Sequence, residues 1–365
     1  MPGRGRKPPA EVAGAKHAAN TSIRRALLAW YSSNARTHPW RGTTDPYAVW
    51  VSEIMLQQTQ IATVTPYYQR FLNAFPTVSH LAEAPLERVL ELWSGLGYYR
   101  RARHLHQAAQ AVAQMPGAKF PEDYAGLRAL AGIGDYTSRA MLSIAFNQPY
   151  AVLDGNVARV VARLYSLRGN LHQSQFRRTV EKELAALLSH REPGNFNQAM
   201  MELGQTVCLP RGPRCSTCPL ARWCGGYRGG NPEDFPLARP RRAAETHHLA
   251  VALIRRGTTV AMVQGLEEGL LDDLWNFPSA LGVTPSEALE SLKQKVHRLT
   301  RGSFTIGSPF GKFRHTITYR SIQGEVYPIE TARPICHTSL KWFELGVLPQ
   351  AAISKLARKI VQKIS

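Results

Sequence analysis

The sequence has no long uninterrupted run of apolar residues, and it has far fewer acidic than basic residues. A helix that crosses a membrane needs about 20 consecutive, mostly apolar residues, so we expect no membrane span. The first residues also lack the apolar core of a secretory signal, so we expect none. The 45 lysines and arginines exceed the 26 acids and give a net charge of +19. This surplus favours a polyanionic partner, nucleic acid before a membrane surface, although a basic protein without such a partner has the same composition.

Cysteine is scarce as well, with five residues in a chain of 365. Cys336 stands alone, and the other four crowd together as Cys208, Cys215, Cys218 and Cys224. Such clustering indicates a metal centre in a reducing compartment rather than disulfides. We expect a cytoplasmic protein, associated with the nucleoid if the source is prokaryotic. The spacing has a single C-x2-C pair and lacks the paired knuckles typical of zinc, so we predict an iron–sulfur cluster and keep structural zinc as the alternative.

The length favours two domains. Residues 1–20 are basic and rich in proline and glycine, which predicts a disordered arm. Residues 21–224 follow helical spacing throughout, and residues 225–245 have the Gly, Pro and Arg content of a linker. From residue 246 the texture changes to a smaller α+β domain, with strands expected at 248–254, 258–263, 313–326 and 341–343 and a helix at 287–300.

The stretch 124–164 reads as helix, tight turn, helix, extended segment and helix. Its turn at residues 130–134 contains Gly132 and Gly134, which can adopt backbone angles that a Cβ would forbid. A turn of this kind leaves backbone N–H groups uncovered at a helix start, where they can hold a phosphate without reading sequence. Glycine-rich turns between helices are common, so this feature is weak when taken alone.

Two carboxylates lie in contrasting surroundings. Glu53 sits in an apolar helical stretch, and a carboxyl desolvated by such neighbours keeps its proton near neutral pH, which suits a general acid. Asp154 follows an apolar run and precedes a helix, whose dipole favours the anion. Alone, Glu53 is equally consistent with a surface or ion-paired residue and Asp154 with a plain helix cap. As a pair they can divide the roles of proton donor and charged stabiliser, which suits breaking a glycosidic bond.

A second glycine-flanked turn, at residues 95–99, presents Tyr98 and Tyr99 immediately before a run that contains three arginines. Aromatic rings beside cations suit base stacking and phosphate contact. The alternative is a pair of core tyrosines beside a solvated basic face.

Together these motifs resemble the adenine DNA glycosylase (MutY) branch of the helix-hairpin-helix superfamily that includes endonuclease III. The resemblance rests on P-W-R at 39–41, the helix at 50–59, G-L-G-Y-Y at 95–99, L-x-G-I-G-x-Y-T at 130–137, L-D-G-N-V at 153–157 and the four cysteines. It implies an all-α helix-hairpin-helix glycosylase domain with a [4Fe-4S] loop and a smaller, Nudix-like α+β domain for lesion recognition. The implied activity is monofunctional removal of adenine mispaired with 8-oxoguanine or guanine in double-stranded DNA, and we expect a monomer.

The resemblance also implies roles for single residues. Glu53 matches the acid that protonates adenine at N7, and Asp154 matches the carboxylate that stabilises the sugar cation. Tyr136 matches a tyrosine packed against these groups, and Asn156 an asparagine bonded to them. The implied DNA- and base-binding residues are Trp40, Arg41, Leu56, Gln58, Tyr98, Gly132, Gly134 and Gln198.

Two further positions refine this expectation. Relatives that also cut the DNA backbone carry a lysine where this chain has Tyr136, and Arg139, the nearest cation, is a poor nucleophile, so we expect no efficient strand cleavage. The lesion-reading loop of the family usually reads H-x-F-S-H, whereas this chain has His315, Ile317 and Thr318 followed by Tyr319. This departure leaves open how strongly 8-oxoguanine is preferred over guanine, and residues 315–319 could also be a plain edge strand.

Two other functions compete with this one. A relative that removes thymine opposite guanine would share most motifs, but Tyr136 and the additional C-terminal domain argue against it. A DNA-binding protein without catalysis would need only the hairpin and the cluster, but the presence of both Glu53 and Asp154 argues against it.

Overall fold

Helices form every regular element from residue 10 to residue 237 in this computed structural model. The structure describes residues 10–237, 245–266, 270–317, 319–331, 335, 337–346, 348 and 353–364. It divides into two units, Met1–Glu83 with Gln107–Pro240 and Ala84–His106 with Arg241–Ser365. Among the described residues, no helix has the length and apolar character that crossing a membrane requires.

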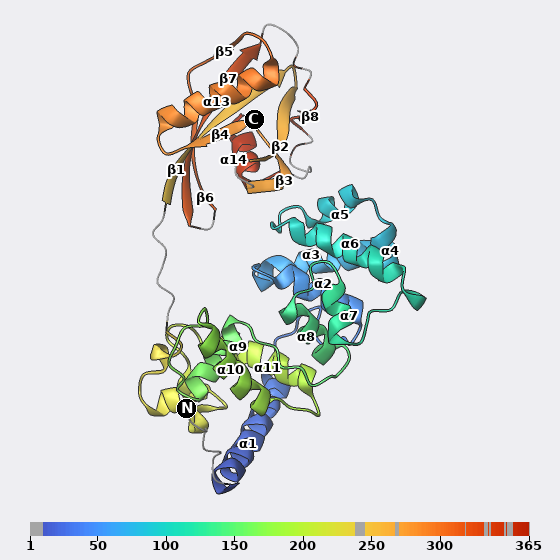
Figure 1. The fold of residues 1–365 in the computed structure, drawn as a ribbon, viewed down its shortest axis with the longest axis vertical. Coiled ribbons are helices and arrows are strands. Elements are labelled where there is room, and N and C mark those ends of the chain that lie inside the picture. The colour runs from blue at the N-terminus through green and yellow to red at the C-terminus, as the bar shows by residue number, and fades with distance from the viewer. Residues whose placement is uncertain are drawn as a thin grey trace, which may run out of the picture. The chain divides into compact units, whose positions relative to one another are not determined.

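The α-helices of this region, coloured from blue through green to yellow in Figure 1, are separated by turns. They are α1 (Ala10–Asn34), α2 (Pro46–Leu56), α3 (Ile61–Ala74), α4 (Val78–Glu83), α5 (Leu86–Trp93), α6 (Arg100–Ala113), α7 (Tyr124–Ala129), α8 (Asp135–Ile144), α9 (Gly155–Leu164), α10 (Ser174–Leu187), α11 (Pro193–Thr206) and α12 (Gly225–Arg228). Single 3-10 turns occur at Pro116–Ala118, Cys215–Thr217, Ala221–Trp223 and Pro232–Asp234.

The structure differs from the sequence prediction in two segments, the predicted disordered arm at residues 1–20 and the predicted linker at residues 225–245. Helix α1 already begins at Ala10, because residues 10–20 are rich in alanine, the strongest helix former, so the prediction of disorder there was wrong. Residues 1–9 lie outside the described part of the chain. Within the predicted linker, Phe235 is buried in the helical core, and its carbonyl accepts a hydrogen bond from Arg163 at 3.1 Å.

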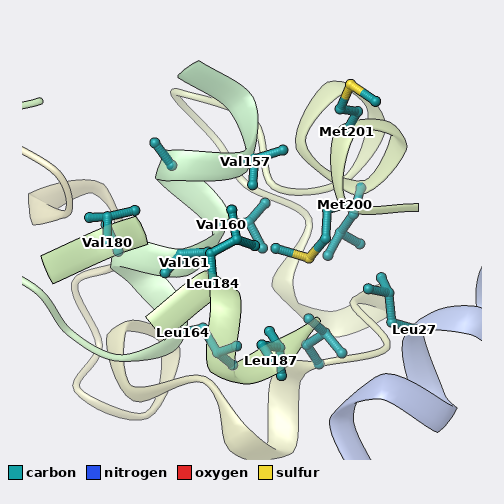
Figure 2. Close-up of a cluster of buried hydrophobic side chains, with 14 of the residues drawn as sticks. Leu27, Val157, Val160, Val161, Leu164, Val180, Leu184, Leu187, Met200 and Met201 are labelled. Carbon is teal, nitrogen blue, oxygen red and sulfur yellow. The ribbon is translucent and has the colours of Figure 1, made fainter. Parts of the chain in front are cut away.

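Helix α9 lies in a hydrophobic core of the helical unit (Figure 2). Its residues Val157, Val160, Val161 and Leu164 recur at helical spacing and are buried, so one face of the helix is apolar. This face packs against side chains of α1, α10 and α11, including Leu27, Val180, Leu184, Leu187 and Met200. The N-terminus of α9, which carries Asp154, is therefore anchored by a rigid helix.

Helices α9 and α11 approach each other closely at Gly204. A Cβ on this glycine would lie 2.7 Å from the Cβ of Asn156, closer than side chains tolerate. The absence of a side chain at residue 204 thus allows α11 to contact the first turn of α9, next to Asp154.

The C-terminal region is an α+β unit, as predicted. Its strands are β1 (Glu245–Arg256), β2 (Thr259–Leu266), β3 (Leu270–Asn276), β4 (Ser279–Gly282), β5 (Phe304–Ile306), β6 (Gly311–Ile317), β7 (Arg320–Thr331) and β8 (Leu340–Glu344). The sheet has the order β3-β2-β1-β7-β5, with β4 paired to β1, β6 to β7 and β8 to β2. Strands β1 and β7 are parallel, and the other pairs are antiparallel. The more specific prediction of a Nudix-like fold stays a prediction.

Two helices cover opposite faces of this sheet, α13 (Pro285–Thr300) and α14 (Lys355–Ile364) (Figure 1). Because strand side chains alternate between faces, Ala250 and Ile254 of β1 pack with Leu292 of α13. The intervening Val251 packs in the cluster that contains Ile360 of α14.

The core around α9 predicts a stability effect for Leu184→Ala. The side chain of Leu184 is 1% exposed, so its truncation leaves a cavity and should lower the free energy of unfolding by about 2–5 kcal/mol. Lys182→Ala, at an exposed position of the same helix, should change it by less than about 0.5 kcal/mol. Denaturant unfolding measures both, and equal effects would contradict the assignment of this core.

Candidate active site

A pocket of about 430 Å³ lies within the helical unit. It is bordered by α2, α8 and α11, by the segment between α1 and α2, and by the start of α9. Eight of the residues predicted from the sequence line it together: Trp40, Arg41, Glu53, Leu56, Tyr136, Asp154, Asn156 and Gln198. The structure thus brings the two predicted carboxylates to one pocket, although about a hundred residues of sequence separate them.

Glu53 lies in α2, where every residue from Tyr47 to Met55 is buried, and is itself 7% exposed. Burial raises its pKa from an ordinary 4.5 to about 7, because a desolvated carboxylate is disfavoured. A hydrogen bond from Tyr136 and the positive charge of Arg41 oppose this shift, and the negative charge of Asp154 adds to it. Glu53 is therefore able to hold a proton near neutral pH, as the sequence predicted.

The Tyr136 hydroxyl lies within reach of two acceptors, the Glu53 carboxyl group and the Met201 Sδ atom at 3.4 Å. A hydroxyl has one proton to donate, and a thioether is a weak acceptor, so we assign the bond to Glu53. Burial, followed by the charge of Glu53, raises the pKa of Tyr136 well above its ordinary value. Tyr136 thus remains a neutral donor that orients the acid.

Asp154 is both the helix cap that a plain reading suggests and a pocket residue. One carboxylate oxygen accepts a hydrogen bond from the Val157 backbone N–H at 2.7 Å, at the N-terminus of α9. The other accepts from the Asn156 side-chain amide at 3.1 Å. Two donors and the positive end of the helix dipole stabilise a negative charge here.

Asn156 is itself held in place. Its amide oxygen accepts from the Arg159 Nη2 atom at 2.9 Å, which fixes the orientation of the amide. The guanidinium of Arg159 also donates to the backbone carbonyls of Gly204 and Cys208, both at 2.8 Å. A continuous chain of hydrogen bonds therefore connects Asp154 to the backbone of the first clustered cysteine.

A buried acid that the sequence reasoning missed holds two arginines of the pocket lining. Glu202 of α11 is fully buried and binds the guanidinium groups of Arg41, at 3.3 Å, and Arg36. Arg41 in turn donates to the side-chain oxygen of Gln198, and Arg36 donates to that of Gln205 at 2.7 Å. The sequence did contain a signal for this ion pair, because Glu202 lies among apolar residues of α11 and a buried carboxylate requires cationic or hydrogen-bonding partners.

The hairpin turn between α7 and α8 has the predicted form, with one correction. Gly132 adopts a left-handed φ of +74°, whereas Gly134 has an ordinary φ of −84° and is the N-cap of α8. Its missing side chain leaves α8 without a side-chain cap, so the first N–H groups of the helix are not covered by a capping side chain. Gly134 therefore leaves the first N–H groups of α8 accessible to a ligand, whereas its own backbone angles are ordinary.

Gln58 and Tyr98 share an unusual backbone. Gln58 has a φ of +56° in the turn after α2, and Tyr98 has a φ of +51° in the turn before α6. Positive φ is uncommon for residues with a side chain and is often found at functional sites. Gln58 is exposed, and the Tyr98 ring is 55% exposed, so each side chain is presented to solvent.

The four clustered cysteines border one small cavity and are not paired in disulfides. Burial, with smaller contributions from the neighbouring thiolates, raises the pKa of Cys218 to about 12. The buried Arg163 spans the loop by donating to the carbonyls of Leu209 and Pro210. Among the described residues, no three His, Cys, Asp or Glu side chains are placed to hold a metal ion.

The predicted lesion-reading residues belong to the C-terminal unit. His315 is half-buried on β6, where burial, followed by the charges of Lys359 and Lys355, lowers its pKa. Ile317 is the last residue of β6, and Thr318 lies outside the described residues. Cys336 lies outside them as well.

A hairpin turn with an uncovered helix start, beside a pocket with two carboxylates, defines a class of protein. Over residues 51–186 the chain matches the model of the HhH-GPD superfamily base excision DNA repair protein. The solved structure of a thermostable thymine-DNA glycosylase has the same helical fold, with a TM-score of 0.54 and 24% identity over 59% of this chain and 99% of that chain. The helical unit is thus that of a helix-hairpin-helix DNA repair glycosylase.

Whole-chain comparisons narrow the class further. The adenine DNA glycosylase of Mus musculus is 33% identical over 402 residues, which cover 93% of this chain and 77% of that protein. The adenine DNA glycosylase of Homo sapiens is 32% identical, with 93% and 73% covered. The chain belongs to the adenine DNA glycosylase family, so it is a DNA glycosylase enzyme whose partner is DNA.

The pKa of Glu53 predicts a pH-dependent effect of Glu53→Gln on stability. Because the folded-state pKa is raised, the wild-type protein loses stability as pH rises from about 4.5 through about 7, and the neutral amide does not. Relative to wild type, the variant should gain about 2–3 kcal/mol in the free energy of unfolding between pH 5 and pH 8.

Denaturant unfolding at several pH values tests this. Glu122→Gln, at an exposed glutamate of the same unit, is the control and should show no such trend. Parallel pH profiles for Glu53→Gln and wild type would contradict the shifted pKa.

Proposed function

We propose that the enzyme is a monofunctional adenine DNA glycosylase that acts as a monomer on double-stranded DNA. It hydrolyses the N-glycosidic bond of adenine mispaired with 8-oxoguanine or guanine and thereby begins base excision repair. The observation that carries this proposal is the single pocket that Glu53 and Asp154 share in contrasting surroundings. Family membership supports the choice of adenine as the base.

The proposed mechanism divides two roles between the acids. Glu53 in its protonated form donates to N7 of the adenine, so the base leaves as a neutral molecule when the glycosidic bond breaks. The anionic Asp154 stabilises the positive charge that develops on the deoxyribose. Water then adds to the sugar, which leaves an abasic site, and Tyr136 and Asn156 keep the two carboxyl groups oriented.

The polar wall of the pocket supports recognition of adenine. Arg41 and Gln198, which bind each other, offer a donor and an amide to the edge of the base. Trp40 and Leu56 line the same pocket and supply apolar surface for its faces. Enzymes that extrude a base from the DNA double helix hold it by hydrogen bonds at its edge and by packing against its faces.

The target adenine has to leave the base stack, because its N7 is otherwise out of reach of an acid inside the protein. We propose that the N–H groups beyond Gly132 and Gly134 hold a backbone phosphate near the extruded nucleotide. The side chains of Gln58 and Tyr98 would enter the DNA double helix near the lesion. Their exposure and the positive φ angles of both residues support this role.

We propose that the C-terminal unit reads the base opposite adenine. His315, Ile317 and Thr318 are the residues of this unit that match the lesion-reading loop of the family. Ile317 would act as the apolar wedge, and the Thr318 hydroxyl would contact the edge of 8-oxoguanine.

Strand cleavage is not part of the proposed activity. A lyase requires an amine that can form a Schiff base, and the pocket lining contains two arginines but no lysine. Arg139, the nearest cation in sequence to Tyr136, is engaged with Asp135 at 2.7 Å.

We propose that Cys208, Cys215, Cys218 and Cys224 hold a [4Fe-4S] cluster. Four thiolates around one cavity are the donor set of such a cluster. A single zinc ion would need all four sulfur atoms at about 2.3 Å from one point. When bound, the cluster supplies a rigid cross-link for the loop, and the nearby Arg211, Arg214 and Arg222 can then meet phosphates.

The substrate prediction is tested on four duplexes. We expect alkali-dependent cleavage of the adenine strand in A:8-oxoguanine and A:G duplexes, and none in T:G or A:T duplexes. Product from T:G would identify a thymine glycosylase, and cleavage without alkali would identify a lyase. Tight binding without any product would leave a DNA-binding protein.

The catalytic roles are tested by Glu53→Gln and Asp154→Asn. Each should lower the single-turnover rate by about 10²-fold or more and leave DNA affinity nearly unchanged, since a transition-state interaction is lost. Asp123→Asn is a matched control, because Asp123 caps α7 at 2.8 Å but does not line the pocket. A wild-type rate in Asp154→Asn would reduce Asp154 to a helix cap.

The cluster is tested by chemical analysis of the purified protein. We expect about four iron and about four sulfide per chain, and a loss of both in Cys215→Ser. Cys336→Ser, at the isolated fifth cysteine, should retain them. One zinc per chain and no sulfide would favour the structural zinc alternative.

A further inference from the structure

Tyr98 lies in the turn between α5 and α6, residues 94–99, whose backbone is unusual. Gly95, Gly97 and Tyr98 have positive φ angles of 102°, 78° and 51°. The steric cost of this conformation falls on Tyr98, because glycine has no Cβ. A residue with a side chain keeps a positive φ only when the surrounding structure fixes it there. The contacts that hold this turn therefore also determine where the Tyr98 ring points.

One backbone oxygen of the turn accepts two side-chain hydrogen bonds. The Gly97 carbonyl accepts from the Trp93 Nε1 atom at 3.1 Å and from the Arg101 Nη2 atom, also at 3.1 Å. Trp93 is the last residue of α5 and is fully buried, whereas Arg101 lies in the first turn of α6. The peptide group that joins Gly97 to Tyr98 is thus fixed by side chains from both flanking helices.

The Arg101 guanidinium also contacts the Tyr98 ring itself. Its central carbon lies 5.4 Å from the centroid of the Trp93 ring and 5.4 Å from that of the Tyr98 ring. Both distances are typical of cation–π interactions. Burial lowers the pKa of Arg101 to about 10, so the group is still charged at neutral pH. One side chain therefore connects a buried anchor, Trp93, to an exposed aromatic ring.

We propose that Arg101 is a positioning residue that orients the Tyr98 ring for entry into the DNA double helix. The inference rests on the role proposed above for Tyr98, and it adds that the orientation of the ring is set before DNA binds. A ring that is already oriented loses less conformational entropy when it is inserted between bases. A guanidinium suits this task, because its planar group can contact aromatic rings and donate to a carbonyl at the same time.

A double-mutant cycle separates this role from direct contact of Arg101 with a DNA phosphate. The probe is an A:8-oxoguanine duplex in which 2′-fluoro-2′-deoxyadenosine replaces the target nucleotide, so that binding is measured without cleavage. Arg101→Met should weaken binding about tenfold, because a cation–π contact and a hydrogen bond are lost. In the Tyr98→Ala background the same change should alter binding less than about twofold, because the ring that Arg101 orients is absent.

Arg100, the exposed first residue of α6, supplies the matched control. Arg100→Met should have the same effect in both backgrounds, because that effect does not depend on the Tyr98 ring. The salt dependence of binding gives a second readout. Loss of one phosphate contact lowers the slope of log affinity against log salt by about 1, whereas Arg101→Met should leave this slope unchanged.

Arg101→Lys keeps the charge but lacks the planar guanidinium, and it carries the test if Arg101→Met does not fold. We expect it to lose most of the affinity that Arg101→Met loses. Wild-type binding by Arg101→Lys, or an Arg101→Met effect that is undiminished in the Tyr98→Ala background, would identify a phosphate ligand and overturn the proposal. Wild-type binding by Tyr98→Ala alone would instead remove the proposed role of Tyr98, and the inference with it.

Discussion

The site depends on one physical effect, the free-energy cost of removing a charged carboxylate from water. Glu53 is buried in an apolar helix, so its proton is retained to about pH 7. Asp154 lies at the same pocket, but a helix N-terminus and an amide donate to it. Two acids of similar intrinsic strength therefore lie in contrasting surroundings, one desolvated and the other hydrogen-bonded at a helix N-terminus. The proposed cleavage of a glycosidic bond uses this contrast, with a proton donated by Glu53 and a negative charge on Asp154.

Keeping Glu53 and Asp154 in contrasting surroundings requires that the other buried polar groups around the pocket form hydrogen bonds and ion pairs with one another. Glu202, which is fully buried, is balanced by two arginines, and one of these also holds Gln198. On the opposite side, Arg159 fixes Asn156 and the backbone of the cysteine loop. Such networks are rigid when each member has its hydrogen-bond partners. They line the pocket with polar and charged groups whose positions are fixed.

The packing of α9 connects the fold to the chemistry. Its apolar face forms the centre of the helical core, and its first turn presents Asp154 to the pocket. Gly204 allows α11 to approach this turn so closely that Asn156 has little room to move. The hydrophobic core and the pocket therefore share the same helix, and the packing of the core fixes the position of the Asp154 carboxylate.

The sequence by itself determined the features that arise from neighbours along the chain. The helical and α+β regions, the cap at Asp154, the desolvating neighbours of Glu53 and the crowding of four cysteines are local patterns. It misjudged residues 10–20, where alanine content outweighed scattered basic residues, and the backbone of Gly134. Tertiary structure alone decided the contacts of Arg36, Gln205 and Glu202, because these join residues more than 160 positions apart. It also decided that β1 and β6 both pair with β7, since strand register rather than sequence spacing brings these strands together.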